Sequence, residues 1–137
     1  MDTSETYIKM CGKAKLDHFW KEGDFYYVPE RSILQKFREI WGKVLVFRKE
    51  EVSYKEWHQV IWLPRQDQLQ EMIPRITDVR CLVLPKLLCE FVYYNHSSVC
   101  NTAKQFTSME QLWLAFMMKE KYNKVWTRQE WEEASQK

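Results

Sequence analysis

Three cysteines and one histidine in the second half of the chain are of the types that bind zinc: Cys81, Cys89, His96 and Cys100. Thiolate sulfur and imidazole nitrogen are the usual ligands of structural zinc. The spacing argues against a site, because gaps of seven, six and three residues replace the close CxxC-like pairs that such sites commonly use. We therefore expect no metal and no cofactor, and free thiols in a reducing compartment.

Nucleophilic catalysis would need a cysteine or serine beside a base. Cys100 and His96 have the spacing of one helical face, but the same stretch also suits a loop. Glycine occurs only at positions 12, 23 and 42, so no glycine-rich phosphate loop can form. Adjacent carboxylates such as Glu132 and Glu133 are typical of a solvated surface. The sequence therefore favours a protein that is not an enzyme.

Nucleic-acid binding is an alternative, since the first forty residues combine lysine and arginine with neighbouring aromatic side chains. Phosphate contact and base stacking use these residue types. Acidic residues dilute the patch, and 21 basic against 19 acidic side chains leave a net charge of only +2. The residues predicted to contact nucleic acid are Tyr26, Tyr27, Arg31, Lys36 and Arg38.

An unknown protein partner is the favoured interpretation, with an oligomer as a further alternative. Trp126 and Trp131 lie near the chain end, where full burial is harder to achieve. They either clamp the terminal segment onto the domain or contact another chain. The methionine and tryptophan residues just before them, at helical spacing, are typical of a core.

Hydrophobic periodicity and capping residues predict the helices that would position these groups. Ser4 is a candidate cap for a helix over 4–21, whose stripe includes Ile8, Cys11 and Phe19. WLPRQDQLQEMI, 62–73, predicts a helix with Pro64 in its first turn and Pro74 at its end. Further helices are predicted over 32–42, from Pro85 to about Asn95, over 107–126 with Thr107 and Glu110 as a capping box, and after a second box from Thr127 to Glu130.

Short runs rich in aromatic and β-branched residues predict the strands. They cover 24–28, 43–49 and 57–63. The second run is apolar on both faces, which predicts a mostly buried strand. We expect the second and third strands to pair as a hairpin.

Three segments carry a resemblance to known proteins: GDFYY at 23–27, WLPRQDQLQEM at 62–72 and MEQLWLAFMMKEKYNKVW at 109–126. Together they resemble a group of small phage and prophage proteins of Gram-positive bacteria, over about the C-terminal two-thirds of the chain. The function of that group is uncharacterised, so the resemblance implies no reaction and no catalytic residue.

The combined prediction is an α+β fold, with a small antiparallel sheet packed against about four helices in a single compact domain, 1–137. A hydrophobic content of 45%, with aromatic residues at 15%, is enough for one core in a chain of 137 residues. The N-terminus lacks the apolar run of a secretory signal, and the apolar region 81–94 is too short and too interrupted for a membrane span. We expect a cytoplasmic phage or prophage accessory protein, in the host cytoplasm, that acts by binding and does not enter a membrane.

Overall fold

The computed structural model describes residues 1–30, 41–48, 60–73, 80–94 and 105–134. These residues form an α+β fold, as predicted, with four helices, a three-stranded antiparallel sheet and a separate two-stranded sheet. The chain divides into two compact units. The sheet unit is Thr3–Pro64, and the helical unit comprises Met1–Asp2 and Arg65–Lys137.

The sheet unit begins with helix α1, Glu5–Ala14. Its predicted cap is confirmed, because the Ser4 side chain accepts a hydrogen bond from the backbone N–H of Tyr7 at 3.2 Å. The predicted extension to residue 21 is wrong. Lys15 has the left-handed backbone conformation, with φ of 48°, and this conformation ends the helix.

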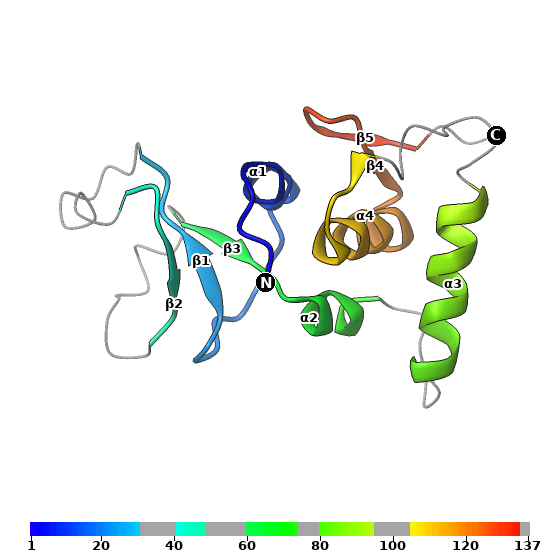
Figure 1. The fold of residues 1–137 in the computed structure, drawn as a ribbon, viewed down its shortest axis with the longest axis horizontal. Coiled ribbons are helices and arrows are strands. Elements are labelled where there is room, and N and C mark those ends of the chain that lie inside the picture. The colour runs from blue at the N-terminus through cyan, green and yellow to red at the C-terminus, as the bar shows by residue number, and fades with distance from the viewer. Residues whose placement is uncertain (31–40, 49–59, 74–79, 95–104, 135–137) are drawn as a thin grey trace. The chain divides into compact units, whose positions relative to one another are not determined.

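The three-stranded sheet has the order β2-β1-β3, so β1, Phe25–Tyr27, lies between the other two (Figure 1). Both β2, Val44–Val46, and β3, Ile61–Leu63, pair with β1 in antiparallel register. The predicted hairpin of the second and third strands is therefore wrong. The prediction that β2 is mostly buried is also wrong, since β2 lies at the edge and Val46 is exposed.

Two contacts fix α1 against β3. A Cβ atom built on Gly12 would lie 2.9 Å from Cδ1 of Ile61, so the absence of a side chain permits this close approach. The Tyr7 hydroxyl donates a hydrogen bond to the backbone carbonyl of Pro64. The sheet itself contributes a core cluster that consists of Tyr26, Val28 and Phe47.

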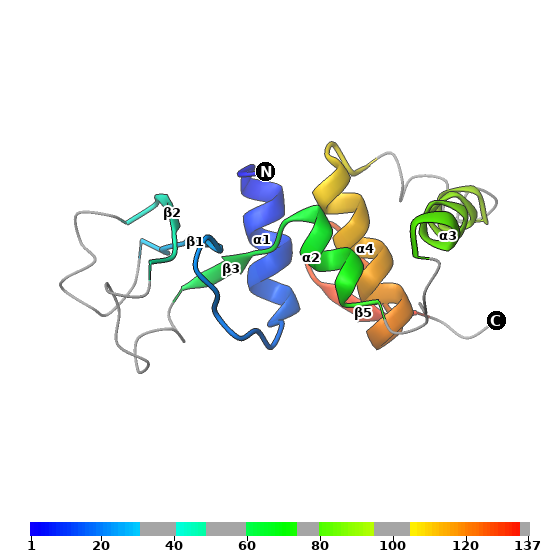
Figure 2. The same ribbon diagram turned by 90° about the horizontal axis from the view of Figure 1, so that it is seen from below.

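The helical unit contains α2, Gln66–Glu71, α3, Arg80–Tyr94, and α4, Met109–Tyr122. Helices α2 and α4 lie side by side (Figure 2). Helix α4 is enclosed on all sides through its centre, which accounts for its weak amphipathic pattern. Its buried side chains are Gln111, Trp113, Leu114, Ala115, Phe116, Met117 and Met118.

The starts of α2 and α4 use different capping contacts from those predicted. Pro64 precedes α2 instead of lying in its first turn, and the backbone N–H of Arg65 donates to the Gln68 side chain at 2.9 Å. At α4 the cap is Ser108, which accepts from the N–H of Gln111 at 3.1 Å; Thr107 lies one residue outside. The helical nature of both segments is confirmed.

Helix α3 begins five residues before the predicted start. Pro85 was expected at the first helical position but lies inside the helix, with its ring exposed. An internal proline costs ~3 kcal/mol because its N–H is missing. Burial of Leu84 and Leu88 offsets part of that cost. The predicted end near residue 95 agrees with the observed end at Tyr94.

The last described segment is a hairpin of β4, Lys124–Trp126, and β5, Trp131–Glu133. Helix α4 therefore stops before the predicted residue 126, because Asn123 adopts the left-handed conformation that ends it. The predicted helix after residue 127 is wrong. Its capping pattern instead closes the turn, where the backbone N–H of Thr127 donates to the carbonyl of Glu130 at 3.0 Å.

The helix predicted over 32–42 lies mostly outside the described residues. Among the helices that the structure describes, none combines the length and apolar character required to cross a membrane.

Candidate functional site

The residues predicted to contact nucleic acid are not brought together in the described part of the chain. Tyr26 is only 3% exposed and belongs to the sheet core, so its ring cannot stack on a base. Tyr27 is half-buried on β1. Arg31, Lys36 and Arg38 lie outside the described residues.

The two tryptophans considered as partner contacts face each other across the terminal hairpin. Trp126 and Trp131 are directly paired, with ring centroids 5.0 Å apart, and Trp126 is 4% exposed. The backbone carbonyl of Trp126 also accepts a hydrogen bond from the Gln105 side chain at 3.2 Å. The arrangement matches the clamp interpretation for Trp126, while Trp131 remains half-buried.

Most of the candidate zinc ligands lie outside the described residues. His96 and Cys100 are not described, and neither is the side chain of Cys81. Cys89 is exposed on α3 and is not in a disulfide, whereas Cys11 is buried. Within the described ranges, no three histidine, cysteine or carboxylate side chains gather as a metal site would require.

The segment between α1 and β1 is fixed by a buried carboxylate that sequence reasoning missed. Asp24 is 1% exposed, and its Oδ2 lies 2.6 Å from Nε2 of His18. The same oxygen accepts a hydrogen bond from the backbone N–H of Lys21 at 2.6 Å. A buried carboxylate requires such partners, because burial without them is costly. Asp24 therefore fixes the segment at two points.

The face of the His18 ring makes a second contact. It stacks on the indole of Trp62 in β3, with centroids 3.5 Å apart and planes that differ by 2°. Trp62 is itself buried, and its Nε1 has no hydrogen-bond partner among the described residues. Stacking and the Asp24 contact together leave His18 one orientation.

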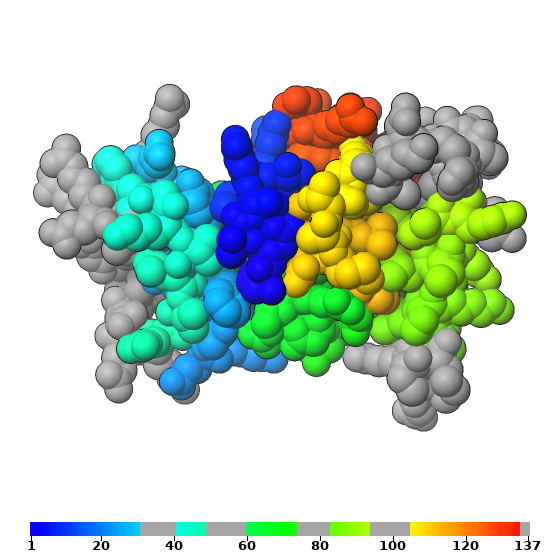
Figure 3. All heavy atoms as spheres, viewed as in Figure 1, coloured from blue at the N-terminus to red at the C-terminus, as the bar shows by residue number. Residues whose placement is uncertain are grey.

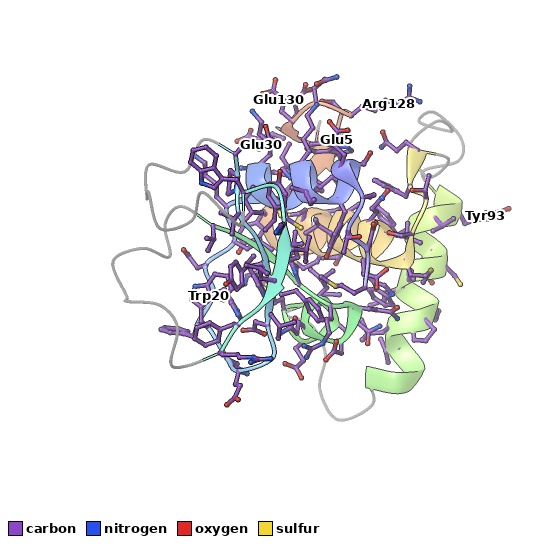
Figure 4. The ribbon with its side chains drawn as sticks, turned by 60° about the vertical axis from the view of Figure 1, so that its left-hand side comes forward. Glu5, Trp20, Glu30, Tyr93, Arg128 and Glu130 are labelled. Atoms are coloured by element: carbon purple, nitrogen blue, oxygen red, sulfur yellow. The ribbon has the colours of Figure 1, made fainter. Side chains whose placement is uncertain are left out.

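On the other side of residue 19, Trp20 packs against the sheet core. Its ring centroid lies 6.1 Å from that of Tyr26 and 5.9 Å from that of Phe47. Figure 4 labels Trp20 beside the strands of the sheet unit. The rings of His18 and Trp20 also form a T-shaped pair, with centroids 5.4 Å apart.

Between these two anchored residues, Phe19 is 86% exposed, more than any other large apolar side chain that the structure describes. The helical prediction placed Phe19 on a buried stripe and was wrong about it. Exposure alternates from Lys13 to Lys21, with the even-numbered side chains half-buried and the odd-numbered ones exposed. Nothing in the sequence indicates the exposure of Phe19, because this residue is itself apolar and lies between His18 and Trp20.

Comparison of the chain with known protein families, with curated proteins and with solved structures finds no match to any of them. The resemblance to phage and prophage proteins stays a prediction.

Proposed function

We propose that this chain is a binding protein without an enzymatic role, and that Phe19 is the anchor that enters a pocket on a protein partner. The observation that carries the proposal is the exposure of Phe19 between two fixed neighbours. A large aromatic side chain gains about 1.5–3 kcal/mol when it moves from water into an apolar pocket. Aromatic anchors of this kind dominate many protein interfaces.

The fixed backbone around Phe19 supports the proposal. A segment whose backbone is already held in place loses less conformational entropy when a partner binds. His18 is held by Asp24 and Trp62, and Trp20 by the sheet core. The loop therefore presents its apolar ring from a prearranged scaffold, as functional loops commonly do.

The charges around Phe19 favour a protein over a nucleic acid. Lys15 and Lys21 are exposed on the same segment, but so are Asp17 and Glu22. A mixed polar rim around an apolar centre is typical of protein interfaces. A nucleic-acid site would concentrate positive charge, because its affinity comes largely from phosphate contacts.

The resemblance to phage and prophage proteins supports a partner in the infected cell, where the chain would act as an accessory protein in the host cytoplasm. Affinity capture from a lysate of phage-infected Gram-positive cells tests the proposal, with and without nuclease. We expect wild-type protein to retain a partner after nuclease treatment and Phe19→Ser to lose it.

Tyr122→Ser is the matched control, because Tyr122 is an exposed aromatic residue at the end of α4. It should retain the same partner as wild type. Retention by Phe19→Ser would contradict the proposal. Loss of every partner after nuclease treatment would instead favour the nucleic-acid alternative.

A further inference from the structure

The sequence of helix α3 is more apolar than is usual for a helix with few buried side chains. Beyond its first residue, its charged side chains are Lys86 and Glu90 alone. Such a helix is usually enclosed on all sides. Among its described side chains, however, only Leu84 and Leu88 are buried.

One side of α3 packs within the helical unit, and the opposite side forms surface. The rings of Phe91 and Phe116 lie 5.4 Å apart, which places Phe91 on the side toward α4. Pro85, Cys89 and Tyr93 follow one another at intervals of four residues, and all three are exposed. Figure 3 shows the side chains of α3 forming part of the molecular surface.

Tyr93 is the most prominent member of this outward stripe. It is 75% exposed, and Figure 4 shows it projecting away from α3. Exposed aromatic side chains in line with other apolar groups are typical of contact surfaces. The stripe defined by Pro85, Cys89 and Tyr93 is therefore a candidate interface.

A pair of opposite charges borders the stripe on one side. Lys86 Nζ lies 3.9 Å from Glu90 Oε1; the Lys86 side chain is largely in solvent and the Glu90 side chain is partly exposed. An exposed pair at this distance contributes little to the stability of its own helix. Both charges remain able to contact a second surface.

We propose that α3 binds α3 of a second copy of this chain, with the two helices antiparallel and related by a twofold axis. In that arrangement a given border of one helix lies against the same border of the other helix. The residues along the two borders run in opposite directions. When the axis passes beside Leu88, Lys86 of each copy faces Glu90 of the other. A parallel pair would bring opposite borders together, so these charges would not meet.

The dimer forms through a small contact. A helix of 15 residues is about 22 Å long at 1.5 Å per residue. One face of that length buries less than the ~800 Å² per partner of a standard interface. We therefore expect a reversible dimer that appears as the protein concentration rises.

Sedimentation velocity from micromolar to hundreds of micromolar protein tests the proposal. Wild type should shift from monomer to dimer. Lys86→Glu should raise the dissociation constant of the dimer about tenfold, because each of the two equivalent contacts between positions 86 and 90 would then bring two negative charges together. The double variant Lys86→Glu/Glu90→Lys should return to within about threefold of wild type. Lys121→Glu, a charge reversal at the end of α4, is the control and should behave as wild type.

Chemical crosslinking gives a second readout that does not depend on the charge variants. Facing helices lie about 8–10 Å apart, so a short bismaleimide should join Cys89 of two copies. Cys89→Ser should abolish the product. A chain that stays monomeric overturns the proposal, as does equal weakening by the single and double charge variants, or a product that persists in Cys89→Ser.

Discussion

His18 and Trp62 lie face to face, with ring centroids 3.5 Å apart and planes within 2° of parallel. This stack joins the segment after α1 to β3, which follows more than forty residues later in the chain. With the contact from His18 to Asp24, it fixes the loop that exposes Phe19. The stability of this loop is the physical basis of the proposed binding role.

Asp24→Asn should destabilise the sheet unit. Oδ2 of the buried carboxylate meets both His18 and the backbone N–H of Lys21, and an amide oxygen in its place carries no negative charge, so both contacts become weaker. Because a hydrogen bond to a charged group contributes more than a neutral one, we expect a loss of about 1 kcal/mol of unfolding free energy. Urea denaturation measures this cost.

Asp17→Asn is the control for that measurement, since Asp17 is exposed on the same segment. Its unfolding free energy should stay within about 0.5 kcal/mol of wild type. Equal effects of the two substitutions would show that the contacts of Asp24 do not stabilise the loop.

Gly12 and Ile61 should be energetically coupled. Alanine in place of a helical glycine normally adds about 1 kcal/mol to helix stability. At Gly12 the new Cβ would lie 2.9 Å from Cδ1 of Ile61, so that side chain must shift and part of the gain is lost. Ile61→Val removes the clashing methyl group.

A double-mutant cycle measured by urea denaturation checks this coupling. Gly12→Ala should be more favourable in the Ile61→Val background than in wild type, by about 0.5–1 kcal/mol. Purely additive effects would contradict the close approach of α1 to β3.

Gln111→Met should destabilise the helical unit, although methionine has a similar volume. Gln111 is fully buried, and its Nε2 donates to Asp2 Oδ2 at 2.8 Å. Its Oε1 accepts from the backbone N–H of Thr107 at 3.1 Å. The substitution removes the acceptor of the Thr107 N–H and one of the donors to Asp2 Oδ2, which keeps the Ser108 hydroxyl, at a cost of about 1–3 kcal/mol.

Thermal denaturation followed by circular dichroism measures the change. Gln70→Met, on the half-buried side of α2, is the control and should have a much smaller effect. Two equal shifts would argue against a structural role for the Gln111 network.

Asp67 should titrate below its ordinary pKa of 3.8. The hydrogen bonds from the Arg65 side chain lower the pKa of this carboxyl, and partial burial opposes them. Because the folded-state pKa is the lower one, its stabilising contribution is present above pH 3.8 and is lost as the pH falls through the folded-state pKa. The contribution is at most a few tenths of a kcal/mol, since the pair is exposed.

NMR titration of the Asp67 carboxyl checks the direction. In Arg65→Ala the pKa of Asp67 should rise toward the ordinary value. An unchanged Asp67 pKa would show that Arg65 does not cause the shift.

Local sequence patterns predicted the positions of helices and strands better than the pairing between strands. The Ser4 cap and the aromatic run at β1 are short-range features that the sequence displays directly. The Thr127 to Glu130 pattern was misread because its contacts serve a hairpin turn as well as a helix start. The order β2-β1-β3 depends on pairing between distant segments, which periodicity does not specify.

The candidate site was missed for the same reason. Helical spacing of Ile8, Cys11 and Phe19 suggested one continuous buried stripe, but the left-handed conformation at Lys15 ends the helix before Phe19. The partners that hold the loop are Asp24 and Trp62, which only the folded sheet brings to His18.

Site-specific photocrosslinking tests directly whether Phe19 contacts a protein partner. A benzophenone amino acid is placed at position 19 in one variant and at position 122 in another, and each is irradiated in nuclease-treated lysate of phage-infected cells. We expect a crosslinked protein that appears from position 19 and not from position 122. Identical products from both positions, or none from position 19, would contradict a binding role for Phe19.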